Sequence, residues 1–158
     1  MALEIERKFL VTGDAWRQAA RPERIIQGYL SRDPDRTVRV RRRGNGAFLT
    51  VKGRTTGISR TEVEVAISLA EADELFPLCL APLIDKTRHL LKFAGWTWEI
   101  DEFHGANDGL IVAEIELPSG EAGFELPPWV GAEVSHDFRY TNSHLSAHPF
   151  KTWATVQA

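Results

Sequence analysis

The feature that most constrains this 158-residue chain is an alternation of charged and apolar residues with a period of two. Val38-Arg39-Val40-Arg41 and Glu62-Val63-Glu64-Val65 are two examples. Side chains two apart in a strand point the same way, so each such segment turns charge to one face and apolar groups to the other. The pattern predicts strands near residues 3–11, 24–32, 36–43, 47–53, 60–67, 84–93, 96–103 and 109–117.

Short links between these segments predict antiparallel neighbours. Gly44-Asn45-Gly46 is a hairpin turn, because Gly and Asn tolerate a positive φ, and residues 94–95 and 104–109 join two further pairs. Signals for helices are few, and they fall at residues 14–20, 68–77 and 142–150. Eight strands with little helix predict a mainly β (α+β) fold, which is either an antiparallel barrel or a sandwich.

Composition excludes several classes of protein. With 19 basic and 22 acidic residues the net charge is −3, which argues against a generic basic nucleic-acid binder. No apolar run approaches the roughly 20 residues that span a bilayer, and the N-terminus is too acidic for a signal peptide. Cys79 is the single cysteine, so an internal disulfide and a cysteine-based zinc cluster are excluded. We expect a soluble, cytoplasmic protein whose residues 1–158 form one domain.

Fourteen charged residues fall on the charged faces of seven predicted strands. They are Glu4, Glu6, Lys8, Arg39, Arg41, Lys52, Glu62, Glu64, Lys86, Arg88, Glu99, Asp101, Glu114 and Glu116. For any single strand the simpler interpretation is a solvated sheet face with surface ion pairs of small worth. Two features of the whole set argue against it. The faces carry almost only full charges, and acidic and basic pairs are sorted by strand.

A closed eight-stranded barrel with the charged face inside is the sharper hypothesis. Such a barrel is just wide enough to hold one small ligand, and its buried charges need water and partners. The six basic side chains suit a polyanion, since one Arg guanidinium can donate two parallel hydrogen bonds to phosphate oxygens. The carboxylates suit hard divalent cations. Both sets in one cavity suit a metal-bound polyphosphate. The apolar face would lie outside, covered by helices, and a homodimer is one way to cover the remainder.

At this point the residues resemble a known family. Glu4-Ile5-Glu6-Arg7-Lys8 matches the ExExK signature of the CYTH superfamily, the triphosphate tunnel metalloenzymes. Further blocks resemble the family in order along most of the chain: Gln27–Leu30, Val38–Arg41, Thr50–Gly53, Glu62–Glu64, Lys86–Arg88, Trp98–Asp101, Ala113–Leu117, Glu133–Ser135 and Arg139–Tyr140. The chain resembles the short, single-domain bacterial members of the inorganic triphosphatase type.

The resemblance implies a closed tunnel that binds a triphosphate with one or two Mg²⁺ or Mn²⁺ ions. By the family pattern the phosphates are clamped by Lys8, Arg39, Arg41, Lys52, Lys86, Arg88 and Arg139. The metal ligands are Glu6, Glu114 and Glu116, with Glu4, Glu62 and Glu64 holding a second ion or the attacking water. The catalytic residues are Lys8, Glu6, Lys52 and Arg41. Roles for Glu99, Asp101 and Tyr29 stay open, and we expect Arg42 and Arg43 to face solvent.

The function that follows is metal-dependent hydrolysis of inorganic triphosphate to pyrophosphate and phosphate, without a nucleic-acid or membrane partner. One alternative is a class IV-type adenylate cyclase, and another is a thiamine or nucleoside triphosphatase. A third alternative is a non-catalytic module that binds polyphosphate or nucleotides. The sequence leaves open the physiological substrate, the preferred metal, the number of metal ions and the oligomeric state.

Overall fold

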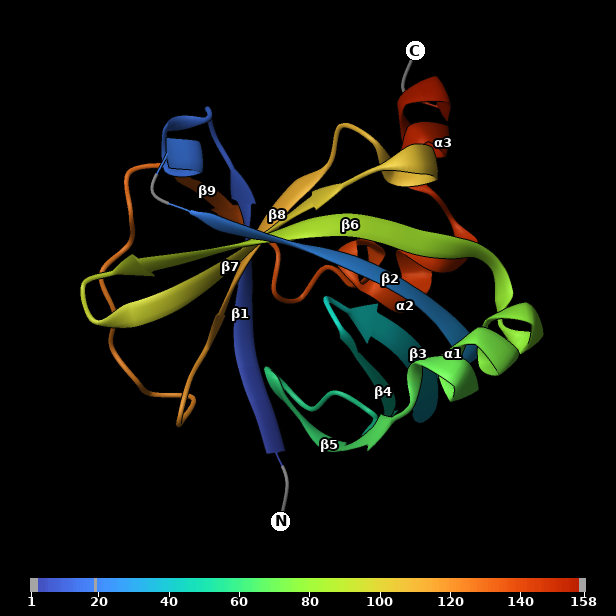
Figure 1. Cartoon of the computed structure of the whole chain (residues 1–158). Coiled ribbons are helices and arrows are strands. Elements are labelled where there is room, and N and C mark those ends of the chain that lie inside the picture. The colour runs from blue at the N-terminus through green and yellow to red at the C-terminus, as the bar shows by residue number, and fades with distance from the viewer. Residues whose placement is uncertain (1–2, 19, 157–158) are drawn as a thin grey trace.

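The computed structural model describes residues 3–18 and 20–156 (Figure 1). The part of the chain that it describes contains nine strands: β1 (Leu3–Val11), β2 (Arg21–Ser31), β3 (Arg36–Arg43), β4 (Gly46–Gly53), β5 (Ser59–Ile67), β6 (Leu80–Phe93), β7 (Trp96–Phe103), β8 (Ile111–Glu116) and β9 (Val130–Glu133). They form one sheet in the order β5-β4-β3-β2-β6-β7-β8-β1-β9. Every pair in it is antiparallel, as the short links predicted.

Strand β1 closes the sheet into a barrel because it pairs with different strands along its length. Its beginning pairs with β5, where Leu3 lies opposite Thr61, and its middle pairs with β8, where Lys8 lies opposite Glu114. Its end pairs with β9. The predicted eight-stranded closed barrel is therefore confirmed, and β9 is an addition to it. The sequence missed β9 because its four residues show no alternation of charged and apolar side chains.

The helices are short: η1 (Ala15–Gln18), α1 (Leu69–Leu75), η2 (Phe76–Leu78), η3 (Gly105–Asn107), η4 (Phe138–Tyr140), α2 (Asn142–Ala147) and α3 (Phe150–Val156). Helix α1 begins with the predicted capping box, in which Ser68 and Glu71 exchange side-chain and backbone hydrogen bonds. The helix predicted over 142–150 is instead two helices, separated at His148 and Pro149. Among the described residues, no helix has the length and apolar character needed to cross a bilayer.

Two apolar clusters lie on the outer side of the barrel. The larger one contains Phe9, Trp98, Ile100 and Ile115 from β1, β7 and β8. Residues from outside these strands, among them Trp129, pack on them. Its cover comes from η1 and from the irregular segment between β8 and β9, which Figure 1 draws in orange. The second cluster packs α1 against β3 and β4. The predicted inversion of polarity thus holds for these faces, although an irregular segment takes the place of a covering helix at the larger one.

A third apolar cluster lies inside the barrel, at one end. Phe103 and Val112 stand two residues from Asp101 and Glu114 and therefore share their face of the sheet. Leu145 of α2 packs on them, with Phe150 and Trp153 of α3 beside it. The predicted charged interior therefore does not extend along the whole barrel. At one end its place is taken by apolar side chains, on which α2 packs.

Part of the outer surface carries exposed apolar side chains. Val51 on β4 and Val63 and Val65 on β5 are 42 to 54% exposed. The predicted homodimer would cover such a surface, and it stays a prediction.

Candidate active site

A cavity of about 280 Å³ lies inside the barrel, and charged side chains make up most of its wall. The cationic ones are Lys8, Arg39, Arg41, Arg43, Lys52, Arg60, Lys86 and Arg88. The acidic ones are Glu4, Glu6, Glu62, Glu64, Glu99, Glu114 and Glu116. The six basic and six acidic residues singled out for phosphate and metal therefore converge on one cavity, while Arg139 does not line it.

The deepest charges form an ion-pair cluster on β6 and β7. Lys86 Nζ lies 2.8 Å from Asp101 Oδ2, and Arg88 donates to both oxygens of the same carboxylate at 2.8 and 2.9 Å. Burial acts to raise the pKa of Asp101, but the two cations outweigh it and hold the pKa far below its usual range. Burial lowers the pKa of Lys86 to about 8 despite this partner. Asp101 thus fixes the direction of two predicted phosphate-binding side chains.

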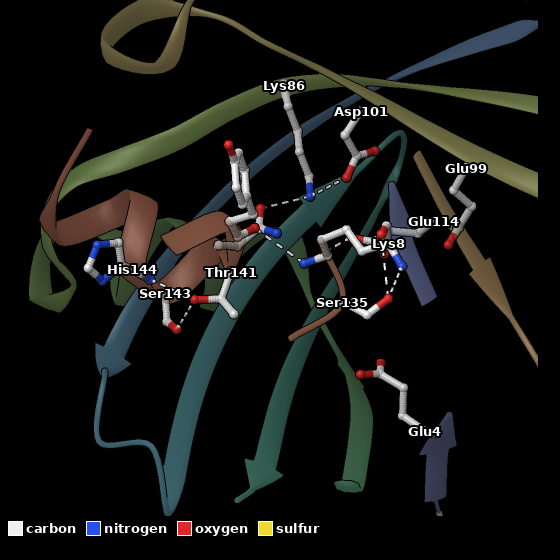
Figure 2. Close-up of polar contacts among 12 residues, drawn as sticks. Glu4, Lys8, Lys86, Glu99, Asp101, Glu114, Ser135, Thr141, Ser143 and His144 are labelled. Atoms are coloured by element: carbon white, nitrogen blue, oxygen red, sulfur yellow. Dashed lines mark hydrogen bonds and ion pairs between the residues drawn. The ribbon is translucent and has the colours of Figure 1, made fainter. Parts of the chain in front are cut away.

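The segment that leads into α2 contacts two of the predicted phosphate-binding lysines (Figure 2). Asn142 Oδ1 accepts hydrogen bonds from Lys86 Nζ at 2.9 Å and from Gln27 Nε2 at 3.0 Å. Lys8 Nζ donates to the carbonyl oxygen of Tyr140 at 3.3 Å and lies 3.5 Å from Glu114 Oε1. Sequence reasoning missed Asn142, because the alternation that revealed the other residues ends with the barrel strands.

A second group of guanidinium groups lies on β3. Arg39 and Arg41 both approach Glu64 Oε2, at 3.4 and 3.3 Å, and Thr50 donates to the same oxygen at 2.6 Å. Burial, with Arg39 and Arg88 nearby, lowers the pKa of Arg41 to about 10. Within the described residues, the buried Nε donors of Arg39 and Arg41 have no hydrogen-bond partner. This wall therefore carries unsatisfied positive donors, which an anion in the cavity can satisfy.

Lys52 on β4 is held between two acids. Its Nζ lies 2.8 and 3.0 Å from the two oxygens of Glu4 and 3.3 Å from Glu62 Oε2. Burial acts to raise the pKa of Glu4, but Lys52 and a hydrogen bond with Glu62 lower it to about 2. Burial and the neighbouring Glu4 raise the pKa of Glu62. The contact with Lys52 therefore keeps Glu4 ionised, while Glu62 gains its proton more easily.

The acidic side chains of β1 and β8 have the character of a site for a divalent cation. Glu6 lies opposite Glu116 in the register of the two strands, and like charges in that position repel each other. Burial, together with Glu114 and Glu4, raises the pKa of Glu6 to about 8, and burial also raises the pKa of Glu116. Neither carboxylate has a hydrogen bond or ion pair within the described residues. A hard cation, which prefers oxygen ligands, would offset both the repulsion between these carboxylates and the cost of burying their charge.

No three Asp, Glu, His or Cys side chains in the described part are gathered closely enough to coordinate an ion. This separation agrees with the repulsion that Glu6 experiences from Glu114 and Glu4, which keeps such carboxylates apart when no cation lies between them. The chemistry of the donors thus fits a metal, and the coordination geometry is not preformed.

Two basic residues lie elsewhere than expected. Arg139 does not line the cavity; its guanidinium is exposed and pairs with Asp137 at 2.6 Å, and its predicted contact with phosphate stays a prediction. Arg43, expected to face solvent, lines the cavity and pairs with Glu23 at 2.7 Å. It stands two residues beyond Arg41, so the alternation itself placed it on the inner face. Tyr29 and Glu99 also line the cavity.

Comparisons with known proteins agree with this geometry. The CYTH domain matches residues 2–144. An inorganic triphosphatase of Acetivibrio thermocellus is 49% identical over 154 residues, which cover 97% of this chain and 99% of that protein. An inorganic triphosphatase of Nitrosomonas europaea is 38% identical over 148 residues, which cover 90% of this chain and 96% of that protein.

A solved structure of an inorganic triphosphatase superposes with a TM-score of 0.66 at 34% identity, covering 92% of this chain and 95% of the other. The family match covers every strand of the barrel that positions the cavity, from β1 into α2. By this match and by its similarity to both triphosphatases, the chain belongs to the CYTH family.

Proposed function

We propose that this protein hydrolyses inorganic triphosphate to pyrophosphate and phosphate in the barrel cavity, with Mg²⁺ or Mn²⁺ as the cofactor. The observation that carries the proposal is the convergence of eight cationic and seven acidic side chains on one small cavity. The two sets nearly neutralise each other. A triphosphate adds about four to five negative charges to such a site, and one or two divalent cations would offset most of them.

The basic and acidic residues have different roles in different parts of the cavity wall. Lys86 and Arg88, held by Asp101, bind phosphate oxygens at the deep end, and Arg39 and Arg41 bind them along the β3 wall. Glu6, Glu114 and Glu116 would hold the main metal, and Glu4, Glu62 and Glu64 would hold a second ion or orient the attacking water. When bound, the cation polarises the phosphoryl group that is transferred.

Water attacks a terminal phosphorus in line with the bond to the bridging oxygen, which leaves with the pyrophosphate. Lys8 and Arg41 stabilise the negative charge that develops on this leaving oxygen. Lys8 acts as a cation in this scheme. Burial acts to lower its pKa, but Glu114 and Glu6 outweigh burial and raise it, so the ammonium keeps its proton.

The wall also bears on the cyclase alternative, in which the same clamp binds ATP. Among the described residues that line the cavity, Tyr29 offers the one aromatic ring and Ile58 the one aliphatic side chain. Sites for organic ligands are predominantly apolar or aromatic, so this wall favours a substrate without an adenine or thiazole ring.

The test is release of orthophosphate from triphosphate, ATP and thiamine triphosphate, each measured with Mg²⁺, with Mn²⁺ and with a chelator. We expect release from triphosphate with either metal, none with chelator, and little from the other two substrates. Cyclic nucleotide from ATP, or binding without turnover, would favour the alternatives instead.

Glu116→Gln tests the site itself. We expect turnover to fall by orders of magnitude while the fold stays intact, because the variant loses a proposed metal ligand. Glu121→Gln, at an exposed position outside the cavity, is the matched control. Unchanged metal-dependent activity of Glu116→Gln would remove Glu116 from the site.

A further inference from the structure

One basic residue of the cavity differs from all the others in its partners. Seven of the eight cationic side chains in the wall each lie within 4.0 Å of a carboxylate oxygen, at distances from 2.7 to 3.5 Å. Arg60 is the eighth, and within residues 3–18 and 20–156 it has no such ion pair. Sequence reasoning passed over Arg60, although it stands two residues before Glu62 on the same face of β5.

Neutral groups hold the Arg60 guanidinium in place. Its Nε donates to the carbonyl oxygen of Gly53 at 3.1 Å, and its Nη2 donates to Thr37 Oγ1 at 3.1 Å. Thr37 is only 5% exposed, so this contact is fixed in the wall. A guanidinium has five N–H donors, and its remaining ones have no partner among the described residues. Arg60 is therefore positioned without being neutralised.

The nearest acids in the strand register are already bound to another cation. Glu4 lies opposite Arg60 where β1 pairs with β5, but both of its oxygens accept from Lys52. Glu62 also pairs with Lys52, at 3.3 Å. The charge of Arg60 thus faces the cavity with free donors and no acid to displace, whereas Arg39 and Arg41 each also contact Glu64.

We propose that Arg60 is a further substrate-binding residue, whose free N–H donors contact phosphate oxygens of the triphosphate. The inference rests on the proposed function and adds a contact to it. Because Arg60 has no ion pair to break, its contact forms as soon as the substrate enters. Its loss therefore weakens binding more than it slows the chemical step.

The experiment compares wild type, Arg60→Gln and Arg60→Lys, with Arg54→Gln as the matched control. Arg54 follows β4, is exposed, and pairs with Asp35 outside the cavity. Calorimetric titration with inorganic triphosphate in chelator measures binding without metal or turnover. Steady-state kinetics with Mg²⁺ then give KM and kcat separately, and thermal denaturation checks the fold.

We expect Arg60→Gln to weaken triphosphate binding about ten- to hundredfold, the range for a lost charged hydrogen bond. Arg60→Lys keeps the charge but loses the planar guanidinium, so its affinity for triphosphate should lie between those of wild type and Arg60→Gln. Arg54→Gln should bind triphosphate like wild type. KM should rise by a larger factor than kcat falls.

Wild-type affinity in Arg60→Gln would overturn the proposal, whether or not that variant melts earlier, since Arg60 would then serve the fold alone. A fall in kcat at unchanged affinity would overturn it as well. If Arg60→Gln does not fold, Arg60→Lys decides by the same comparison. Should wild type release no phosphate from triphosphate, the proposed function fails, and the binding titration still decides whether Arg60 contacts the anion.

Discussion

Asp101 offers the sharpest test of the buried charge network, through the variant Asp101→Asn. Its carboxylate is 1% exposed and accepts three charged hydrogen bonds, one from Lys86 and two from Arg88. Asparagine keeps the shape but removes the charge, and in either orientation its amide N–H₂ faces a donor of Arg88. Breaking a buried ion pair from one side costs about 3–5 kcal/mol, because a buried charge loses its partner.

For a chain of this size each kcal/mol lowers Tm by about 2–4 °C, so the free energy above corresponds to a fall of roughly 6–20 °C. Differential scanning calorimetry at neutral pH measures it. The matched control is Asp85→Asn on the same strand as Lys86, where the half-buried carboxylate accepts two hydrogen bonds at 2.6 Å from the exposed side chain of Arg24. Such a surface pair contributes about 0–1 kcal/mol. A fall in Tm for Asp101→Asn no larger than that for Asp85→Asn would show that the buried Asp101 carboxylate stabilises the fold no more than a surface ion pair does.

Three further predictions follow from the site and its surroundings. In metal-free protein, Glu6→Gln should match the stability of wild type near pH 5 and exceed it at pH 9. Folding raises the pKa of Glu6 from 4.5 to about 8, so the contribution of Glu6 to stability falls as the pH rises through that range. Equal melting temperatures of the two proteins at pH 9 would contradict this. Gly28→Ala should cost about 1–3 kcal/mol in urea unfolding, because a Cβ there would lie 2.8 Å from Cys79 Cβ, an atom next to the backbone that cannot rotate away; Gly123→Ala, with open space around it, is the control. Arg139→Ala should leave the KM for triphosphate unchanged, because that exposed side chain pairs with Asp137 and does not line the cavity; a tenfold rise would show that Arg139 contacts the substrate.

The sequence predicted the barrel and most of the cavity for one physical reason. In a strand, side chains two apart share a face, so a pair such as Arg39 and Arg41 reveals its direction without any knowledge of the tertiary structure. The same rule extends to Arg43 and Arg60, which were missed because the first stands beside a hairpin turn and the second belongs to no basic pair.

Features outside the strands could not be predicted in this way. The contact of Asn142 with Lys86 depends on how α2 docks on the barrel, and no local periodicity encodes that packing. The same holds for Arg139 in η4, whose guanidinium is held by hydrogen bonds with Asp137, the residue that caps this helix. The apolar closed end was not predicted either. Phe103 and Val112 stand on the inner face of their strands, but they carry no charge that would reveal this direction.

If the protein acts as proposed, a metal-bound triphosphate occupies the charged cavity. A crystal grown with triphosphate and Mn²⁺, with anomalous diffraction to locate the metal, shows where both bind. We expect phosphate oxygens within hydrogen-bonding distance of Lys86, Arg88 and Arg41, and Mn²⁺ beside the carboxylates of Glu6 and Glu116. Triphosphate and metal bound only on the outer surface, with the cavity holding water alone, would rule out the cavity as the active site.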